Sequence, residues 1–335
     1  MSRPGGAGGI ASTAGDAVAG EGTDAGRDDL RAAVQEGRDG WLFLVGGTNR
    51  VRRQYRADPA SWLRLRRWRA LIAYRAARAA GLGIRLAHVV VPEKLTVYAD
   101  LCPELGVDWR LSPALRLGRL LAARGNATWI DLVAPMRAAR DGTELYRRTD
   151  THWSPEGCLL AYEAICRALG VAPRDDLLQR PSVEAELALD LGGKLDPPRL
   201  ERVRVHTFQR DAARVHAGPL LAAHEAAGRA EDLHVGAHAV FRNPTAPARI
   251  RMVLFGDSCA HFAPIMLTGM LAETVAELHF IWSANLDWAY VERVRPDVLV
   301  CEMAERFLRR VPQDAFDLDA EQSARLGRLA GAGAL

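Results

Sequence analysis

Short continuous apolar runs alternate with amphipathic segments along most of the chain. Runs of this kind are typical of buried parallel strands, and we predict them at 84–91, 128–132, 249–255, 274–282 and 297–302. Apolar residues spaced three or four apart predict helices at 59–80, 114–123, 134–140, 155–170 and 287–294, with another just after residue 258. The alternation predicts an α/β fold, a three-layer parallel sheet flanked by helices.

The pattern changes between residues 171 and 249. Prolines and glycines interrupt it, and residues 202–208 and 233–241 alternate in the manner of antiparallel strands. We interpret this segment as a small antiparallel β insertion within one domain that extends from 29 to 312. His234 and His238 would share one face of a strand, but no third ligand is identifiable, so no metal site is predicted.

The two ends differ from the central domain. Residues 1–28 are dominated by Gly, Ala, Ser, Thr and Asp, a composition that buries too little surface to order itself, so we expect a disordered tail. A short helix at 30–34, a turn at 36–40 and an apolar strand at 41–45 follow. Residues 313–335 are rich in Ala, Gly and Asp and are expected to be peripheral.

Composition and charge exclude several classes. The chain has 335 residues, and its 44 basic against 41 acidic residues are too balanced to indicate nucleic-acid binding. The arginine-rich stretch 64–69 is interpreted as a solvated helix face. Five scattered cysteines predict neither a disulfide framework nor a zinc site. Without a secretory signal or a run of 18 apolar residues, we expect a cytoplasmic protein with no membrane span.

The segment around Asp150 and His152 carries the first half of a candidate catalytic site. An acid two residues before a histidine can hold one imidazole nitrogen, which fixes the tautomer and leaves the other nitrogen as a base. Ser154 fits the N-cap of the following helix and Pro155 its first position. The pair is therefore predicted on a short loop anchored by a helix.

The second half lies about a hundred residues further on. A predicted strand ends in Gly256-Asp257-Ser258, and a serine on a tight turn between a strand and a helix exposes its hydroxyl beside backbone N–H groups. Together the two segments supply a nucleophile in Ser258, a base in His152 and its orienting acid in Asp150. Cys259 is the alternative nucleophile, although no separate base favours it.

Other residues are candidate substrate contacts. Lys94 follows a predicted buried strand, where α/β proteins usually bind ligands, and the alternative is a surface lysine. Tyr146 and Trp153 flank the Asp150 loop, although Trp153 alternatively packs beneath it. Asn285 is a candidate oxyanion donor or substrate contact. For Glu302 and Arg306 we favour a structural ion pair at a strand end over a catalytic role.

Five motifs in order resemble the SGNH-hydrolase-like domain of the alginate O-acetyltransferase family, whose members acetylate bacterial exopolysaccharides. They cover residues from about 36 to 310: Gly37-Arg-Asp-Gly-Trp-Leu-Phe43, Val91-Pro-Glu-Lys-Leu-Thr-Val-Tyr98, Tyr146-x-x-Thr-Asp-Thr-His-Trp153, Gly256-Asp-Ser258 and Glu302-x-x-Glu-Arg306. The resemblance implies the Ser258, His152 and Asp150 roles given above. Cys259 stands where the family commonly has a large aromatic residue.

The expected function is O-acetyl transfer to a hydroxyl of a carbohydrate or sugar-bearing small molecule through an acyl-serine intermediate. If water replaces the acceptor, the same site is an esterase. A non-catalytic module that binds a sugar or a biosynthetic partner protein is the alternative from another class. No cofactor is expected beyond an acyl donor. The missing secretion signal favours an intracellular acceptor over an exported polymer.

Overall fold

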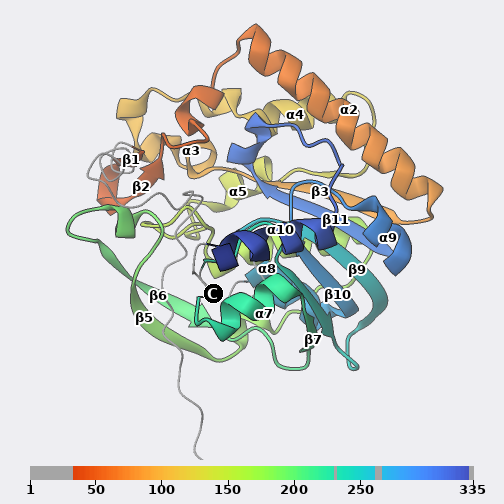
Figure 1. Cartoon of the computed structure of the whole chain (residues 1–335). Coiled ribbons are helices and arrows are strands. Elements are labelled where there is room, and N and C mark those ends of the chain that lie inside the picture. The colour runs from red at the N-terminus through yellow and green to blue at the C-terminus, as the bar shows by residue number, and fades with distance from the viewer. Residues whose placement is uncertain (1–32, 230–231, 261–265, 332–335) are drawn as a thin grey trace, which may run out of the picture.

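The computed structural model describes residues 33–229, 232–260 and 266–331. In these residues seven strands form the central sheet, in the order β4-β3-β11-β9-β10-β8-β7 (Figure 1). Their bounds are β3 Arg85–Val91, β4 Trp129–Ile130, β7 Ala213–Ala217, β8 His238–Arg242, β9 Ala248–Gly256, β10 Val275–Trp282 and β11 Val298–Ala304. The strands predicted from the continuous apolar runs are therefore confirmed.

The sheet is mostly parallel, with an antiparallel edge. Strands β4, β3, β11, β9 and β10 run parallel to their neighbours, as predicted. Strand β8 pairs antiparallel with β10, and β7 pairs antiparallel with β8. Both antiparallel strands, β8 and the edge strand β7, come from the segment interpreted as an insertion. That segment thus extends the central sheet as well as forming the separate antiparallel hairpin of β5 Ser182–Ala188 and β6 Leu200–His206.

Helices cover both faces of the sheet and complete the three layers. Along β11, Val298 and Val300 enter the apolar cluster shared with α6 and α8, whereas Leu299 enters a cluster on the opposite face with α9. This alternation is what a strand buried on both faces requires. The helices are α2 Pro59–Gly81, α3 Lys94–Val97, α4 Pro113–Ala122, α5 Val133–Ala139, α6 Pro155–Leu169, α7 Pro219–Ala226, α8 Met266–Thr274, α9 Trp288–Val294 and α10 Leu318–Gly331.

Each end of the domain contains an element that the sequence did not predict. Val34 begins strand β1 (Val34–Glu36), which pairs with β2 (Leu42–Leu44), where a helix at 30–34 was expected; residues 1–32 lie outside the described ones. The carboxyl-terminal segment, expected to be peripheral, contains α10, which packs beside α7 (Figure 1). Leu318 and Gln322 are buried there because their side chains face the domain.

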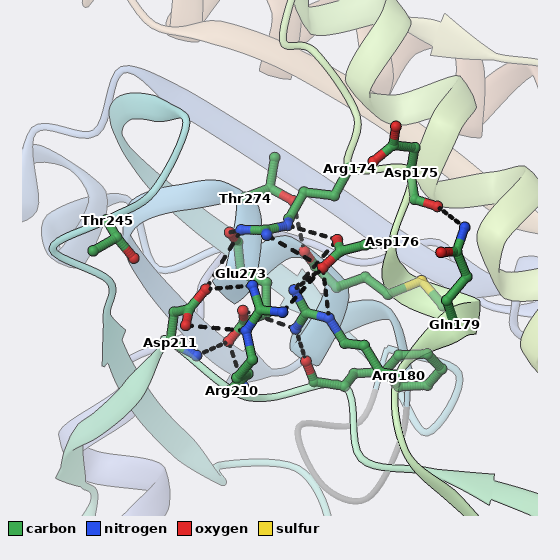
Figure 2. Close-up of polar contacts among 12 residues, drawn as sticks. Arg174, Asp175, Asp176, Gln179, Arg180, Arg210, Asp211, Thr245, Glu273 and Thr274 are labelled. Carbon is green, nitrogen blue, oxygen red and sulfur yellow. Dashed lines mark hydrogen bonds and ion pairs between the residues drawn. The ribbon is translucent and has the colours of Figure 1, made fainter.

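A buried charge network fixes the 171–249 segment to α8 (Figure 2). Glu273 is fully buried at the end of α8, and its Oε1 accepts the backbone N–H groups of Arg210, Asp211 and Ala212 at 2.8–2.9 Å. Its Oε2 lies 2.8 Å from Nη1 of Arg180. Because these bonds favour the charged form more than burial opposes it, the pKa of Glu273 is lowered.

Among the described helices none combines the length and the apolar character that a membrane span needs.

Candidate active site

The candidate residues lie where the parallel strands end. Each candidate segment follows one parallel strand: Pro92–Lys94 follows β3, Asp257–Ser258 follows β9, Ser283–Asn285 follows β10 and Glu305–Arg306 follows β11. Carboxyl ends of neighbouring parallel strands meet at one edge of a sheet, which is where α/β proteins bind ligands. The fold thus brings the candidate segments to one edge.

The Asp150–His152 pair has the predicted geometry. Nδ1 of His152 lies 2.8 Å from Oδ1 of Asp150, and the same oxygen accepts the His152 backbone N–H at 3.2 Å. The loop is anchored as expected, because Ser154 Oγ accepts the Gly157 N–H at the start of α6. His152 is 3% exposed, and its Nε2 is buried without a hydrogen-bond partner in the described part of the chain. A fixed Nδ1 and an unpartnered Nε2 are the features of a base awaiting a proton.

Electrostatics favour the ion pair within this loop. Burial opposes the charge on Asp150, but His152 and then Arg147 outweigh it and hold the pKa of Asp150 well below its usual range. Burial likewise opposes protonation of His152, yet the Asp150 carboxylate prevails and the pKa of His152 is raised. Asp190 adds to this effect. The carboxylate therefore stabilises an imidazolium when one forms.

Ser258 lies on the turn that follows β9, and it is partly exposed. The carboxylate of Asp257 shapes this turn, since Oδ1 accepts the Cys259 N–H at 2.8 Å and Oδ2 accepts the Ala304 N–H at 2.6 Å. The turn is thereby tied to the end of β11.

Cys259, the alternative nucleophile, is 1% exposed in the apolar core. Burial, followed by the nearby carboxyl groups of Asp257 and Glu302, raises the pKa of its thiol well above the usual value. Because the thiolate is the reactive form of cysteine, this environment makes Cys259 unreactive. The structure therefore favours Ser258 over Cys259.

The side chain of Arg306 lies close enough to both halves of the site to affect each electrostatically. Arg306, at the end of β11, acts electrostatically on both His152 and Cys259, the residue next to Ser258. Its Nη1 lies 3.0 Å from Oε1 of Glu93, so the ion pair at this strand end joins Arg306 to Glu93 and not to Glu302 as we had favoured. Nε2 of His152 makes no hydrogen bond to Ser258 within the described residues. Contact between base and nucleophile thus remains a proposal.

Lys94 is a buried clamp. Its ammonium lies 2.6–3.0 Å from the backbone oxygens of Leu42, Arg147, Arg148 and Asp150. Burial lowers the pKa of Lys94 to about 7, against the opposing effect of Asp150 and other carboxylates. Four carbonyl oxygens around Nζ suit an ammonium with three N–H donors and not an amine with a lone pair. This placement ties β2 to the Asp150 loop and does not support direct substrate contact.

Replacing Lys94 with methionine is expected to destabilise the protein by about 3 kcal/mol, because it leaves several buried carbonyl groups unpaired. Activity should fall as well, since the Asp150 loop loses its anchor. Thermal unfolding and ester turnover measure the two effects. The control is Arg110→Met, which removes a cation whose side chain is 70% exposed and should change neither. Unchanged stability in Lys94→Met would contradict the clamp.

The remaining predicted contacts are also engaged within the protein. Tyr146 is buried and donates its hydroxyl to the Pro92 carbonyl oxygen. Trp153 is fully buried in the core, which agrees with packing beneath the loop. Oδ1 of Asn285 accepts the Gln313 and Asp314 N–H groups at 3.0 and 3.3 Å. In this arrangement the three side chains support the edge of the sheet.

Sequence reasoning missed the support that the insertion gives to the Asp150 loop. Glu201 Oε2 accepts both the N–H and the hydroxyl of Thr149 at 2.7 Å, and Asp190 Oδ2 accepts the Thr151 hydroxyl at 2.6 Å. Gly192 lies so close that an added Cβ would stand 3.2 Å from Cβ of Thr149. The two carboxylates follow their loop partners by 39 and 52 positions, so no local pattern identified them.

Two clusters of described residues have the donor types that metal ions accept. One is Asp150, His152 and Asp190, and the other is Asp257, Cys259 and Glu302; in each, one ligand atom per residue lies within 4.8 Å of the others. Asp150 and His152 already satisfy each other, and Asp257 accepts backbone N–H groups through both carboxylate oxygens. Neither cluster therefore needs an ion to account for its arrangement.

The fold and the site define a class. An α/β sheet with a serine on the turn after β9 and an Asp-x-His loop agrees with the SGNH-hydrolase-like class that the motifs resemble. The model of the family "SGNH hydrolase-like domain, acetyltransferase AlgX" matches residues 34–222. This is more than half of the chain, and the chain belongs to that family, which confirms the resemblance inferred from the motifs.

Relatives and solved structures agree with this assignment. The chain is 28% identical over 148 residues to the probable alginate O-acetylase AlgJ of Pseudomonas aeruginosa, covering 43% of this chain and 34% of that protein. The chain thus spans about a third of that relative. The O-acetyltransferase domain of Pseudomonas putida AlgJ superposes with a TM-score of 0.55 at 18% identity, over 87% of this chain and 99% of the domain. Bacillus cereus PatB1 with a sulfonyl adduct gives 0.54 at 12% identity, over 84% and 97%. These superpositions confirm the fold.

Proposed function

We propose that the protein is an O-acetyltransferase that uses Ser258 as nucleophile, His152 as base and Asp150 as the acid that orients it. The observation that carries the proposal is the buried, unpartnered Nε2 of His152, whose Nδ1 is held by Asp150. Membership of a family described by an acetyltransferase supports the reaction class. The likeness to the alginate O-acetylase AlgJ supports a polysaccharide acceptor.

In the first half-reaction, Nε2 of His152 takes the proton of the Ser258 hydroxyl as Oγ attacks the acyl carbonyl. The donor's leaving group departs with that proton, and the acyl group remains on Oγ as an ester. In the second half, His152 takes the proton of an acceptor hydroxyl, whose oxygen attacks the ester carbonyl. Ser258 then recovers its proton from His152. Asp150 stays ionised throughout and stabilises the imidazolium.

The backbone of the turn offers one oxyanion donor. Three N–H groups of the turn already have acceptors. That of Asp257 donates to Glu302, that of Cys259 to Oδ1 of Asp257, and that of Ala260 to the carbonyl oxygen of Asp257. The N–H of Ser258 has no such acceptor among the described residues, so we assign it to the oxyanion of the tetrahedral intermediate.

An arginine-lined cavity supports an anionic acceptor such as an acidic polysaccharide. It has a volume of about 440 Å³ and is lined by Arg52, Arg53, Tyr55, Arg56, Leu105, Gly106 and Val107. The three arginines are exposed, and none forms an ion pair with a carboxylate in the described part of the chain. Tyr55 connects the cavity to the strand-end edge, since its hydroxyl lies 2.7 Å from Oγ1 of Thr96, two residues beyond Lys94. Carboxylate groups of an acceptor chain would complement this charge.

The test uses a chromogenic acetyl ester as donor, with an oligouronate and a neutral oligosaccharide of equal length as acceptors. Transfer to the oligouronate should exceed hydrolysis, and Arg53→Glu should reduce that transfer about tenfold, or about 1.4 kcal/mol. Arg53→Glu should leave hydrolysis of the acetyl ester by water unchanged. The control, Arg110→Glu, should change neither transfer nor hydrolysis. Hydrolysis alone would identify an esterase. No turnover with several acyl donors would identify a binding module.

The cytoplasmic location expected from the amino-terminal composition stays a prediction. The donor, the acceptor and any pathway partner protein are likewise proposals, and the reaction above requires no cofactor beyond the acyl donor.

A further inference from the structure

A second carboxyl group lies directly beneath the Ser258 turn. Glu302 is on β11, next to β9, and its side chain enters the same side of the core as Cys259 and Ala260. Its Oε2 accepts the backbone N–H of Asp257 at 3.1 Å. The fit is close, since a Cβ added to Gly256 would lie 3.0 Å from Oε2 and 2.5 Å from Cβ of Ala260.

The surroundings of Glu302 suit a neutral acid. The residue is 2% exposed, and its Oε1 is buried with no hydrogen-bond partner among the described residues. An ionised carboxylate with an unpaired buried oxygen is costly. Burial, followed by the Asp257 carboxylate, raises the pKa of Glu302 well above its usual value, and Arg306 opposes this only in part.

Asp257 is the member of this carboxyl pair whose charged form the backbone stabilises more. It accepts two backbone N–H groups at 2.6 and 2.8 Å, whereas Glu302 accepts that of Asp257 at the longer 3.1 Å. Hydrogen bonds to a carboxylate stabilise its ionised form. Two carboxyl groups this close do not both ionise readily, so the proton resides on Glu302.

We propose that Glu302, in its neutral form, is a positioning residue that holds the backbone of the Ser258 turn from below through the N–H of Asp257. This inference rests on the proposed function, because the turn is held for the attack of Ser258. Glu302 does not touch the substrate. Its oxygen fixes the residue before the nucleophile, and so sets where Oγ and the Ser258 N–H point relative to the acyl carbonyl.

Two substitutions at one position separate this role from simple packing. Glu302→Gln keeps the shape, the neutral charge and an oxygen for the Asp257 N–H, so its kcat should stay within about threefold of wild type. Glu302→Leu fills similar space without that oxygen. Its kcat should fall about 100-fold with little change in KM, because a misplaced nucleophile loses orientation and not binding. The control is Cys301→Val, which lies on the same strand but faces the opposite side of the sheet and should leave kcat unchanged.

Each outcome decides a specific point. Wild-type kcat in Glu302→Leu would overturn the positioning role. If kcat falls as far in Glu302→Gln as in Glu302→Leu, Glu302 does not act in its neutral form. If Glu302→Leu does not fold, Glu302→Asp, which withdraws the carboxyl by one methylene, must show the same loss of kcat. Ser258→Ala is assayed in parallel. Turnover that survives this change would reject the proposed function itself, whatever the Glu302 variants show.

Discussion

Replacing Ser258 with alanine is expected to reduce turnover of a chromogenic acetyl ester by about 10⁴-fold or more. The reason is that the variant has no oxygen on which the acyl group can be carried, while the turn and the His152 loop stay in place. The fold should not change, because Ser258 is partly exposed and its side chain makes no hydrogen bond to another residue in the described ranges. Thermal unfolding of the variant should therefore match that of wild type.

The matched control for this experiment is Cys259→Ala. Its thiol is buried and held in the unreactive protonated form, so the variant should lose some stability and keep most of its turnover. A serine-directed sulfonyl fluoride should add one sulfonyl group to the wild type and to Cys259→Ala, and none to Ser258→Ala. Mass spectrometry of the intact protein measures this. If Ser258→Ala is labelled and Cys259→Ala is not, the nucleophile is Cys259.

Replacing Asp150 with asparagine is expected to lower kcat by about 10³- to 10⁴-fold, because the amide neither selects the correct tautomer of His152 nor stabilises the imidazolium. The pH profile should also change. His152 acts as a base only when neutral, so wild-type activity rises with pH through its raised pKa. Burial opposes protonation, so without the Asp150 carboxylate the pKa of His152 falls and the residual activity persists to lower pH.

Asp190→Asn is the matched control for that profile. Asp190 also raises the pKa of His152, and its carboxylate accepts the Thr151 hydroxyl. The variant should move the acidic limb of the profile in the same direction by a smaller amount and retain more of its kcat. An Asp150→Asn variant whose pH profile is identical to that of wild type would show that His152 is not the titrating base.

Much of the central domain could be predicted from sequence. Continuous apolar runs such as 84–91 are buried on both faces of a parallel sheet, and a strand covered on both faces requires apolar residues on both. The edge of the sheet could not be predicted in the same way. The sequences of β7 and β8 carry no signal that distinguishes strands of the central sheet from a separate hairpin, because the pairing is antiparallel in either case. Their partner is chosen by tertiary packing.

By itself the sequence determined the local chemistry of this protein. Asp150 and His152 are two residues apart on a capped loop and Ser258 follows β9 by two residues, and such short-range geometry follows from backbone rules alone. Only the tertiary structure decided what surrounds them. Lys94 became a buried clamp and Glu302 a buried acid beneath the Ser258 turn because burial and pairing depend on groups that lie 45 residues or more away along the chain.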